Sequence, residues 1–214
     1  MTATVGVPVH SNALGHADAA ALASALRRLP HLALHASTAT RSVTALAGRT
    51  GEDFALLTPR RGRPSLLTRG PGDQLGRELT RVVPAMQELV GAVEMRAPTA
   101  SADVSLGPGD ALALAELARR GDQSRLDVAL AEVGVPGLPW WISDFAWGAR
   151  AQLSIALVVD GEWRASTSMQ LLERGWGCLH ADESGDIGFA PLTAERVQAR
   201  VGTFSRLLMG AGDD

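Results

Sequence analysis

The sequence predicts an α+β fold made of two similar halves, and three observations lead to this prediction. Short segments with strand character precede an amphipathic segment with helical spacing, and this order occurs twice along the chain. The two occurrences match at a single offset, which lays Phe54 on Trp176. With 214 residues, 46% of them hydrophobic and 20% charged, the chain can bury a core and has the composition of a globular protein.

The match between the halves extends over pairs of apolar positions in a strand and in the helix that follows. These pairs are Phe54 and Trp176, Leu57 and Leu179, Leu75 and Val197, Leu79 and Val201, and Val82 and Phe204. A common order of elements at one offset indicates an internal duplication. We therefore expect an irregular segment over 1–17 and then a single domain over 18–214. Its two pseudo-repeated halves, with sheets that meet about a pseudo-twofold axis, are expected at 18–94 and 101–210.

In the first half, the sequence predicts a helix, four strands and a second helix. The first helix is expected over 16–30, since Asp18 stands near its start and Pro30 ends it. The second is expected over 70–86, because apolar residues recur there at helical spacing on one face. The strands between them are joined by polar turns and are expected at 31–38, 41–48, 53–59 and 63–69.

In the second half, two helices, two hairpins and a final helix are expected. Gly121 divides the two helices, the pair Asp160-Gly161 is a strong signal for the turn of the first hairpin, and Thr193 is the N-cap of the final helix. These elements follow a linker at 95–101, with the helices at 107–134, the hairpins at 150–170 and 174–191, and the final helix at 192–210.

The composition excludes several classes of function. A net charge of −3 and an isoelectric point near 6.0 argue against a nucleic-acid-binding protein, which would carry a basic excess. The chain shows neither a signal peptide nor an apolar run long enough to cross a membrane, and its one cysteine, Cys178, is expected to be a buried strand residue. We expect a cytoplasmic protein. All 20 basic residues are arginine, which is typical of the GC-rich genomes of actinobacteria.

No catalytic or cofactor-binding motif stands out, so we expect no catalytic residue, no metal and no cofactor. His31 and His35 are assigned to the outer face of a strand, because leucines alternate with them. The segment 182–188 matches a calcium loop only in part. It lacks the glycine and the final glutamate that such a loop needs, so a hairpin turn is expected there instead.

Four of the aromatic rings of the chain gather in the segment 138–147, which reads LPWWISDFAW. If Pro139 starts a helix, one helical face is expected to pack into the core and consists of Trp141, Ile142, Phe145 and Ala149. Trp140, Asp144 and Trp147 share another face. Trp140 and Trp147 therefore either pack inside the protein or form an exposed surface that binds a partner.

A second candidate site is the turn at 59–63, which carries Arg60, Arg61 and Arg63. Such a turn can receive an acidic segment of a partner. The alternative is an ordinary solvated turn in a protein whose only long cation is arginine. Both interpretations stay open on the sequence alone.

The order of elements resembles that of the EspG family, the cytoplasmic chaperones of ESX (type VII) secretion in actinobacteria. In the first half, the resemblance rests on a hairpin and a third strand that lead into a helix ending in Val83-Pro84. In the second half, the segment 102–118 is similar to the short strand and helix of the family. The closing segment is similar in Arg150 and Gln152, which open a strand, and in Gly175-Trp176, which precede the entry of the last helix. The resemblance covers residues 41–209. Members of the family begin with an extra segment, which this chain either lacks or has replaced with residues 1–40.

The resemblance implies a quasi-twofold α+β fold with a central antiparallel sheet flanked by helical bundles. It further implies a non-catalytic chaperone that binds a PE–PPE heterodimer, with neither nucleic acid nor membrane as a partner. Trp140 and Trp147 would be apolar anchors, and Arg60, Arg61 and Arg63 a polar rim.

Two alternatives stay open. One is a small-molecule-binding protein or an unrecognised enzyme, whose pocket between the halves would contain His31, His35 or Asp144. The other is a diverged relative that serves as a homodimeric structural component.

Overall fold

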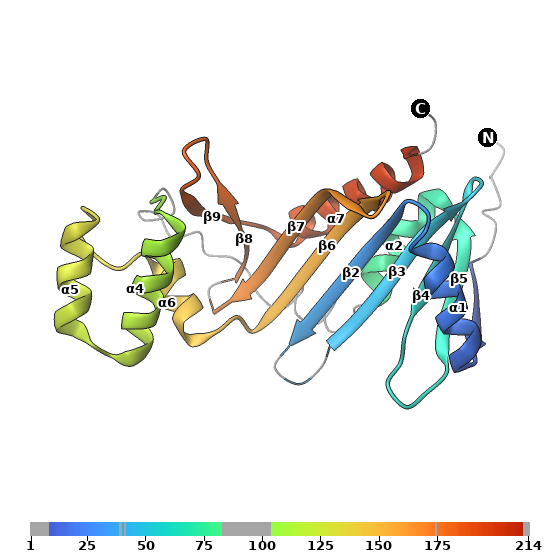
Figure 1. Cartoon of the computed structure of the whole chain (residues 1–214), viewed down its shortest axis with the longest axis horizontal. Coiled ribbons are helices and arrows are strands. Elements are labelled where there is room, and N and C mark those ends of the chain that lie inside the picture. The colour runs from blue at the N-terminus through green and yellow to red at the C-terminus, as the bar shows by residue number, and fades with distance from the viewer. Residues whose placement is uncertain (1–8, 39, 41, 83–103, 174, 212–214) are drawn as a thin grey trace. The chain divides into compact units, whose positions relative to one another are not determined.

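The computed structural model confirms the α+β class and describes residues 9–38, 40, 42–82, 104–173 and 175–211 (Figure 1). The first elements along the chain are β1 (His10–Leu14), α1 (His16–Leu26), β2 (His31–Thr38), β3 (Ser42–Thr50), β4 (Asp53–Thr58), β5 (Ser65–Pro71), the 3-10 helix η1 (Gly72–Gln74) and α2 (Leu75–Val82). The later elements are α4 (Pro108–Arg120), α5 (Gln123–Glu132), α6 (Trp140–Trp147), β6 (Ala151–Val159), β7 (Glu162–Leu172), β8 (Gly175–Ala181), β9 (Ile187–Pro191) and α7 (Ala194–Gly210).

The nine strands of the described chain form one antiparallel sheet in the order β1-β5-β4-β3-β2-β6-β7-β8-β9. In β2 and β3, for example, Leu34 lies opposite Ala45. The predicted turn between β6 and β7 is present, with φ angles of 54° at Asp160 and 80° at Gly161. Positive φ at both central residues is the geometry that a tight two-residue hairpin requires. The order of four strands before a helix occurs twice, first in β2–β5 and again in β6–β9.

The chain divides into two compact units. Unit 1 contains residues 1–91, 153–167 and 195–214, and unit 2 contains residues 92–152 and 168–194. These units group segments by contact rather than by similarity. The pseudo-repeated halves at 18–94 and 101–210 therefore stay a prediction.

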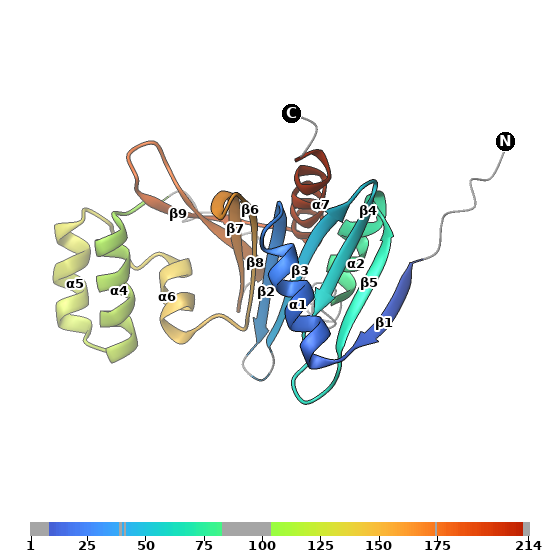
Figure 2. The same ribbon diagram turned by 45° about the vertical axis from the view of Figure 1, so that its right-hand side comes forward.

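In unit 1, helices lie on both faces of the strands β3 to β5, with α1 on one face and α2 on the other (Figure 2). The side of α1 that carries Ala19 and Leu26 packs on buried residues of these strands, namely Ala55, Leu57 and Leu67. Since β4 is covered on both faces, its residues from Phe54 to Thr58 are all buried, without the alternation of a half-exposed strand.

The C-terminal helix α7 also belongs to unit 1 and packs against α2 and β3. A Cβ atom on Gly76 of α2 would lie 3.4 Å from the Cα atom of Gly202 in α7, so the two helices approach each other closely. Arg49 of β3 donates from Nη1 to the carbonyl oxygen of Met209 at 2.7 Å. This bond satisfies a carbonyl group that the end of α7 would otherwise leave unpaired.

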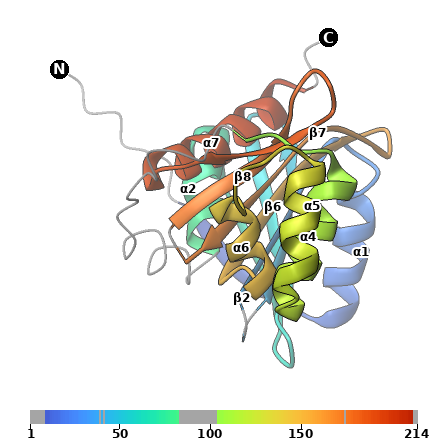
Figure 3. The same cartoon turned by 90° about the vertical axis from the view of Figure 1, so that its left-hand side faces the viewer.

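In unit 2, the helices α4, α5 and α6 lie beside one another (Figure 3). The predicted break between the first two is confirmed, because Gly121 has a left-handed φ of 68° and Asp122 caps α5 by accepting a hydrogen bond from the amide of Arg125. The helices share one hydrophobic core with β9, and its most buried members are Leu114, Trp141, Ile142, Leu172 and Phe189.

Two features of the first half differ from expectation. Residues 10–14, expected to be irregular, form the edge strand β1, whose mostly exposed residues show no apolar alternation that would mark a strand in the sequence. His31, expected on an outer face, is only 5% exposed, and its Nδ1 lies 2.9 Å from the carbonyl oxygen of Leu29. His35 is exposed as expected. The predicted linker at 95–101 lies outside the described residues.

Within the described part of the chain, no helix combines the length and the apolar character that crossing a bilayer requires.

Candidate protein-binding site

The aromatic segment forms helix α6, and the N-terminal end of this helix is buried in unit 2. Trp140 is 6% exposed and Trp141 is 3% exposed. Both rings meet the ring of Phe189 on β9, Trp140 edge-on with centroids 5.2 Å apart and Trp141 stacked at 6.5 Å. Trp140 is therefore a packing residue, contrary to the expectation that it anchors a partner. The reason is that α6 packs against α4 as well as β9, so more than one of its faces is covered.

The C-terminal end of α6 is exposed. Trp147 is the last residue of the helix and is 76% exposed, and Gly148 follows it with a φ of 94° that ends the helix. Among its described residues, unit 2 exposes three further large apolar side chains: Leu112 on α4 at 73%, Val128 on α5 at 59% and Leu179 on β8 at 39%. Of the two predicted aromatic anchors, only Trp147 presents its ring to solvent.

A second exposed tryptophan lies in unit 1, and the sequence reasoning missed it. Trp163 is 77% exposed and stands on β7, two residues after Gly161 of the hairpin turn. Its neighbours in sequence, Glu162 and Arg164, are polar. A single tryptophan between two charged residues beside a predicted turn is a signal of exposure that could have identified it.

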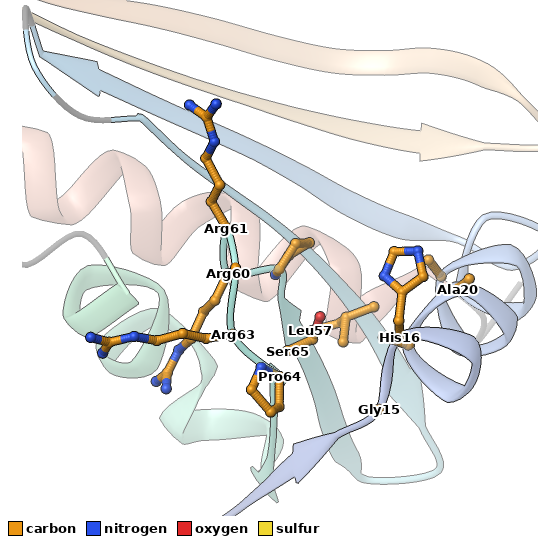
Figure 4. Close-up of a pocket in the computed structure, with 13 residues that line it drawn as sticks. Gly15, His16, Ala20, Leu57, Arg60, Arg61, Arg63, Pro64 and Ser65 are labelled. Atoms are coloured by element: carbon orange, nitrogen blue, oxygen red, sulfur yellow. The ribbon is translucent and has the colours of Figure 1, made fainter.

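The three predicted arginines stand together on the loop between β4 and β5, and all are exposed. The amide of Arg63 donates to the carbonyl oxygen of Arg60 at 3.4 Å, and Gly62 takes a φ of 67°, so the loop turns back on itself. Figure 4 shows the side chains of Arg60 and Arg63 extending on one side of this loop and that of Arg61 on the other.

An open pocket of about 640 Å³ lies in unit 1 between the first turns of α1 and the loop at 59–65, which we call the arginine loop (Figure 4). We call it the arginine pocket. Its apolar wall consists of Ala19, Ala20, Ala23, Leu57, Pro59 and Pro64. Its polar lining consists of the three arginines, His16 and Ser65. The pocket thus combines an apolar wall with a cationic rim.

The loop arginines lack an ion pair within the described residues. Other arginines do pair with a carboxylate, among them Arg81, Arg119, Arg120 and Arg125. A guanidinium that is left solvated at a pocket rim is available to a carboxylate of another molecule.

Two other pockets of unit 1 have a different character. One of about 460 Å³ lies where α2 meets α7, and its Arg49 is already bonded to backbone carbonyls. The other, of about 820 Å³, lies at the end of α7 and is lined in part by Leu157 and Leu207. Neither these two pockets nor the arginine pocket is lined by His31, His35 or Asp144.

The turn at 182–188 is the hairpin turn between β8 and β9, as predicted. The carboxylate of Asp182 accepts hydrogen bonds from the hydroxyl of Ser184 at 2.6 Å and from the amides of Ser184 and Asp186, both at 3.0 Å. These bonds, led by that of the Ser184 hydroxyl, lower the pKa of Asp182. Among the described residues, no group of three or more His, Cys, Asp or Glu side chains has the geometry of a metal site. Cys178 is buried, as expected.

No protein-family model matches the chain, and no curated protein matches it. Among solved structures, the chain is similar to the type VII secretion system chaperone EspG5 of Mycobacterium tuberculosis, determined in complex with a PE25–PPE41 dimer. The two chains share 12% sequence identity with a TM-score of 0.48, over 82% of this chain and 72% of that chain. Similarity at this level assigns neither a family nor a function to the chain.

Proposed function

We propose that the protein is a non-catalytic chaperone or adaptor that acts in the cytoplasm and binds a substrate of type VII secretion, such as a PE–PPE heterodimer. The observation that carries the proposal is the exposure of Trp147 at 76% and of Trp163 at 77%. The class of partner follows from the resemblance of the sequence to the EspG family.

Leaving a tryptophan side chain in water is costly because its apolar surface is large. A tryptophan side chain buries on the order of 150–250 Å² when it packs, and tryptophan is enriched among the residues that contribute most to binding at protein interfaces. The other three tryptophans, Trp140, Trp141 and Trp176, are 6% exposed or less. The chain thus buries three of its tryptophans and presents two, one in each unit, to a partner.

The partner that fits these surfaces is a protein with an exposed apolar helical tip. Each exposed tryptophan would cover apolar side chains of the partner that otherwise lead to aggregation, and the arginine loop of unit 1 would supply polar contacts to the partner. The proposal therefore still has two aromatic anchors, but Trp163 takes the place of the buried Trp140.

Co-expression with a PE–PPE pair encoded near the gene tests the proposal. We expect the protein to raise the soluble fraction of the pair and to co-purify with it. The double variant Trp147→Ala, Trp163→Ala should lose co-purification while its unfolding temperature changes by a few degrees at most, because both side chains are exposed. The matched control is Leu112→Ala with Val128→Ala, which removes two exposed apolar side chains from α4 and α5.

A pair that stays insoluble with the wild-type protein would contradict the proposal. So would a double tryptophan variant that binds the pair as well as the wild type does.

A further inference from the structure

We infer that the arginine pocket binds a segment of a partner protein in which an apolar side chain stands next to carboxylates. The inference rests on the proposed function in one respect, since it takes the occupant to be a protein. It adds what that function leaves open, namely the chemistry that the partner presents to unit 1.

The wall of the pocket is built to take an apolar side chain. Ala19, Ala20 and Ala23 place only methyl groups along the side of α1 that faces the loop, and Leu57 of β4 is 1% exposed behind them. Small side chains at these positions leave the volume of about 640 Å³ open. An apolar side chain that enters it leaves water and contacts the methyl groups of α1.

The rim of the pocket selects for negative charge. Arg60, Arg61 and Arg63 contribute three positive charges within one loop. The first turn of α1 contributes one negative charge, that of Asp18. The chain as a whole carries a net charge of −3, so this loop is a local positive patch on an acidic protein. Charge complementarity therefore favours an acidic segment and disfavours a basic one.

The loop is also restrained before it meets a partner. Pro59 and Pro64 flank the arginines, and the bond from the Arg63 amide to the Arg60 carbonyl closes the turn. Proline reduces the conformations open to the free loop, so less entropy is lost when the loop is held in a complex. The restraint therefore favours the interpretation that the loop recognises a partner over the interpretation that it is an ordinary solvated turn.

A protein segment is favoured over a nucleic acid as the occupant. A nucleic-acid surface tracks phosphates with a stripe of positive charge, and its domain normally has a basic excess. Here the arginines are confined to one loop, and alanine side chains line the same pocket. A pocket with apolar side chains and a cationic rim matches an alternation of leucine and glutamate.

The test uses the full chain and three synthetic, fluorescein-labelled peptides. The probe consists of repeated Leu-Glu-Glu units, and the two comparison peptides consist of repeated Leu-Lys-Lys and Gly-Glu-Glu units. We expect the first peptide to bind more tightly than either of the others by fluorescence anisotropy. Its affinity should fall as ionic strength rises, because salt screens the contacts with the exposed arginines.

Two pairs of variants locate the binding. Arg60→Glu with Arg61→Glu should weaken binding of the Leu-Glu-Glu peptide by about tenfold or more, since two attractive charges become repulsive. Arg27→Glu with Arg28→Glu makes the same charge change at the other end of α1, outside the pocket, and should leave binding within about twofold. Ala20→Phe fills the pocket and should weaken binding of the Leu-Glu-Glu peptide. Ala21 lies on the same helix but does not line the pocket, so Ala21→Phe should leave binding unchanged.

The inference is overturned if the Leu-Lys-Lys peptide binds as well as the Leu-Glu-Glu peptide, or if Arg60→Glu with Arg61→Glu has no more effect than its control. Binding of free octanoate at the affinity of the peptide would instead identify a small-molecule site and overturn it as well.

Co-purification separates this inference from the proposed function. If the charge-reversed variant retains a PE–PPE pair as the wild type does, the inference fails and the proposed function stands. If no pair is solubilised while the acidic peptide binds the pocket, the proposed function fails instead.

Discussion

The two ends of helix α6 show the same residue type in opposite roles. Trp140 at the first position is 6% exposed and packs on Phe189, whereas Trp147 at the last position is 76% exposed. The sequence places these two residues on one helical face, since seven residues are close to two turns. The difference teaches that a shared face does not ensure a shared environment. What decides is how far along the helix the neighbouring elements reach.

The two ends of α6 also have different roles. The N-terminal end connects the helices of unit 2 to β9 through the ring of Phe189. The C-terminal end holds a large apolar side chain in water. One end contributes to folding, and the other end is available for binding.

The largest expected effect comes from the buried end. Trp141→Ala should lower the free energy of unfolding by about 3–5 kcal/mol, because it leaves a cavity beside Phe189 that the core cannot fill. Urea denaturation followed by circular dichroism measures the change. A loss below 1 kcal/mol would mean that the two ends of α6 do not differ in the way described.

The ring of Phe189, on which Trp140 and Trp141 pack, can be displaced by a substitution outside α6. A Cβ atom on Gly177 of β8 would collide with Phe189, so Gly177→Ala should destabilise the protein by about 1–3 kcal/mol. The matched control is Gly137→Ala, since a Cβ atom there meets nothing within 4 Å. Equal stability of the two variants in urea denaturation would contradict the packing of Phe189 against β8.

A smaller effect on stability is expected at the exposed end of α6. Trp147→Ala should change the free energy of unfolding by no more than about 0.5 kcal/mol, because the side chain makes little contact with the rest of the protein. The same urea denaturation measures this change beside that of Trp141→Ala. A large loss of stability would place Trp147 in the core and remove the difference between the two ends of the helix.

The smallest effect concerns the turn between β8 and β9. Hydrogen bonds lower the pKa of Asp182 below its ordinary value of 3.8. Its contribution to stability is therefore complete above the pKa of the unfolded chain and is lost as the pH falls through the lower pKa of the folded state. Carbon NMR titration of Asp182 measures this pKa directly.

The variant Ser184→Ala removes the first cause of the shift and should raise the pKa of Asp182 toward 3.8. An unchanged pKa in that variant would show that the amides of the turn, rather than the hydroxyl, control the carboxylate.

Most helices and strands could be predicted because their signals are local. Gly121 ends a helix through its own left-handed φ, and Asp160-Gly161 forms a hairpin turn through positive φ at both residues. The edge strand β1 could not be predicted in this way. Its side chains are mostly exposed, and pairing with β5, rather than burial of one face, makes it a strand.

The candidate site was predictable only in part, and for the same reason. That the loop arginines are exposed follows from the Pro and Gly residues around them, which predict a turn. That they and the alanines of α1 line one pocket does not follow, because the two segments meet only when α1 packs on β4.

The sequence by itself determined where the helices and strands other than β1 lie, since backbone preferences and apolar spacing act over a few residues. The tertiary structure alone decided that Trp140 is buried and that Arg60, Arg61 and Arg63 line a pocket. Burial depends on which distant segments come to lie against a residue, and no local pattern of side chains contains that information.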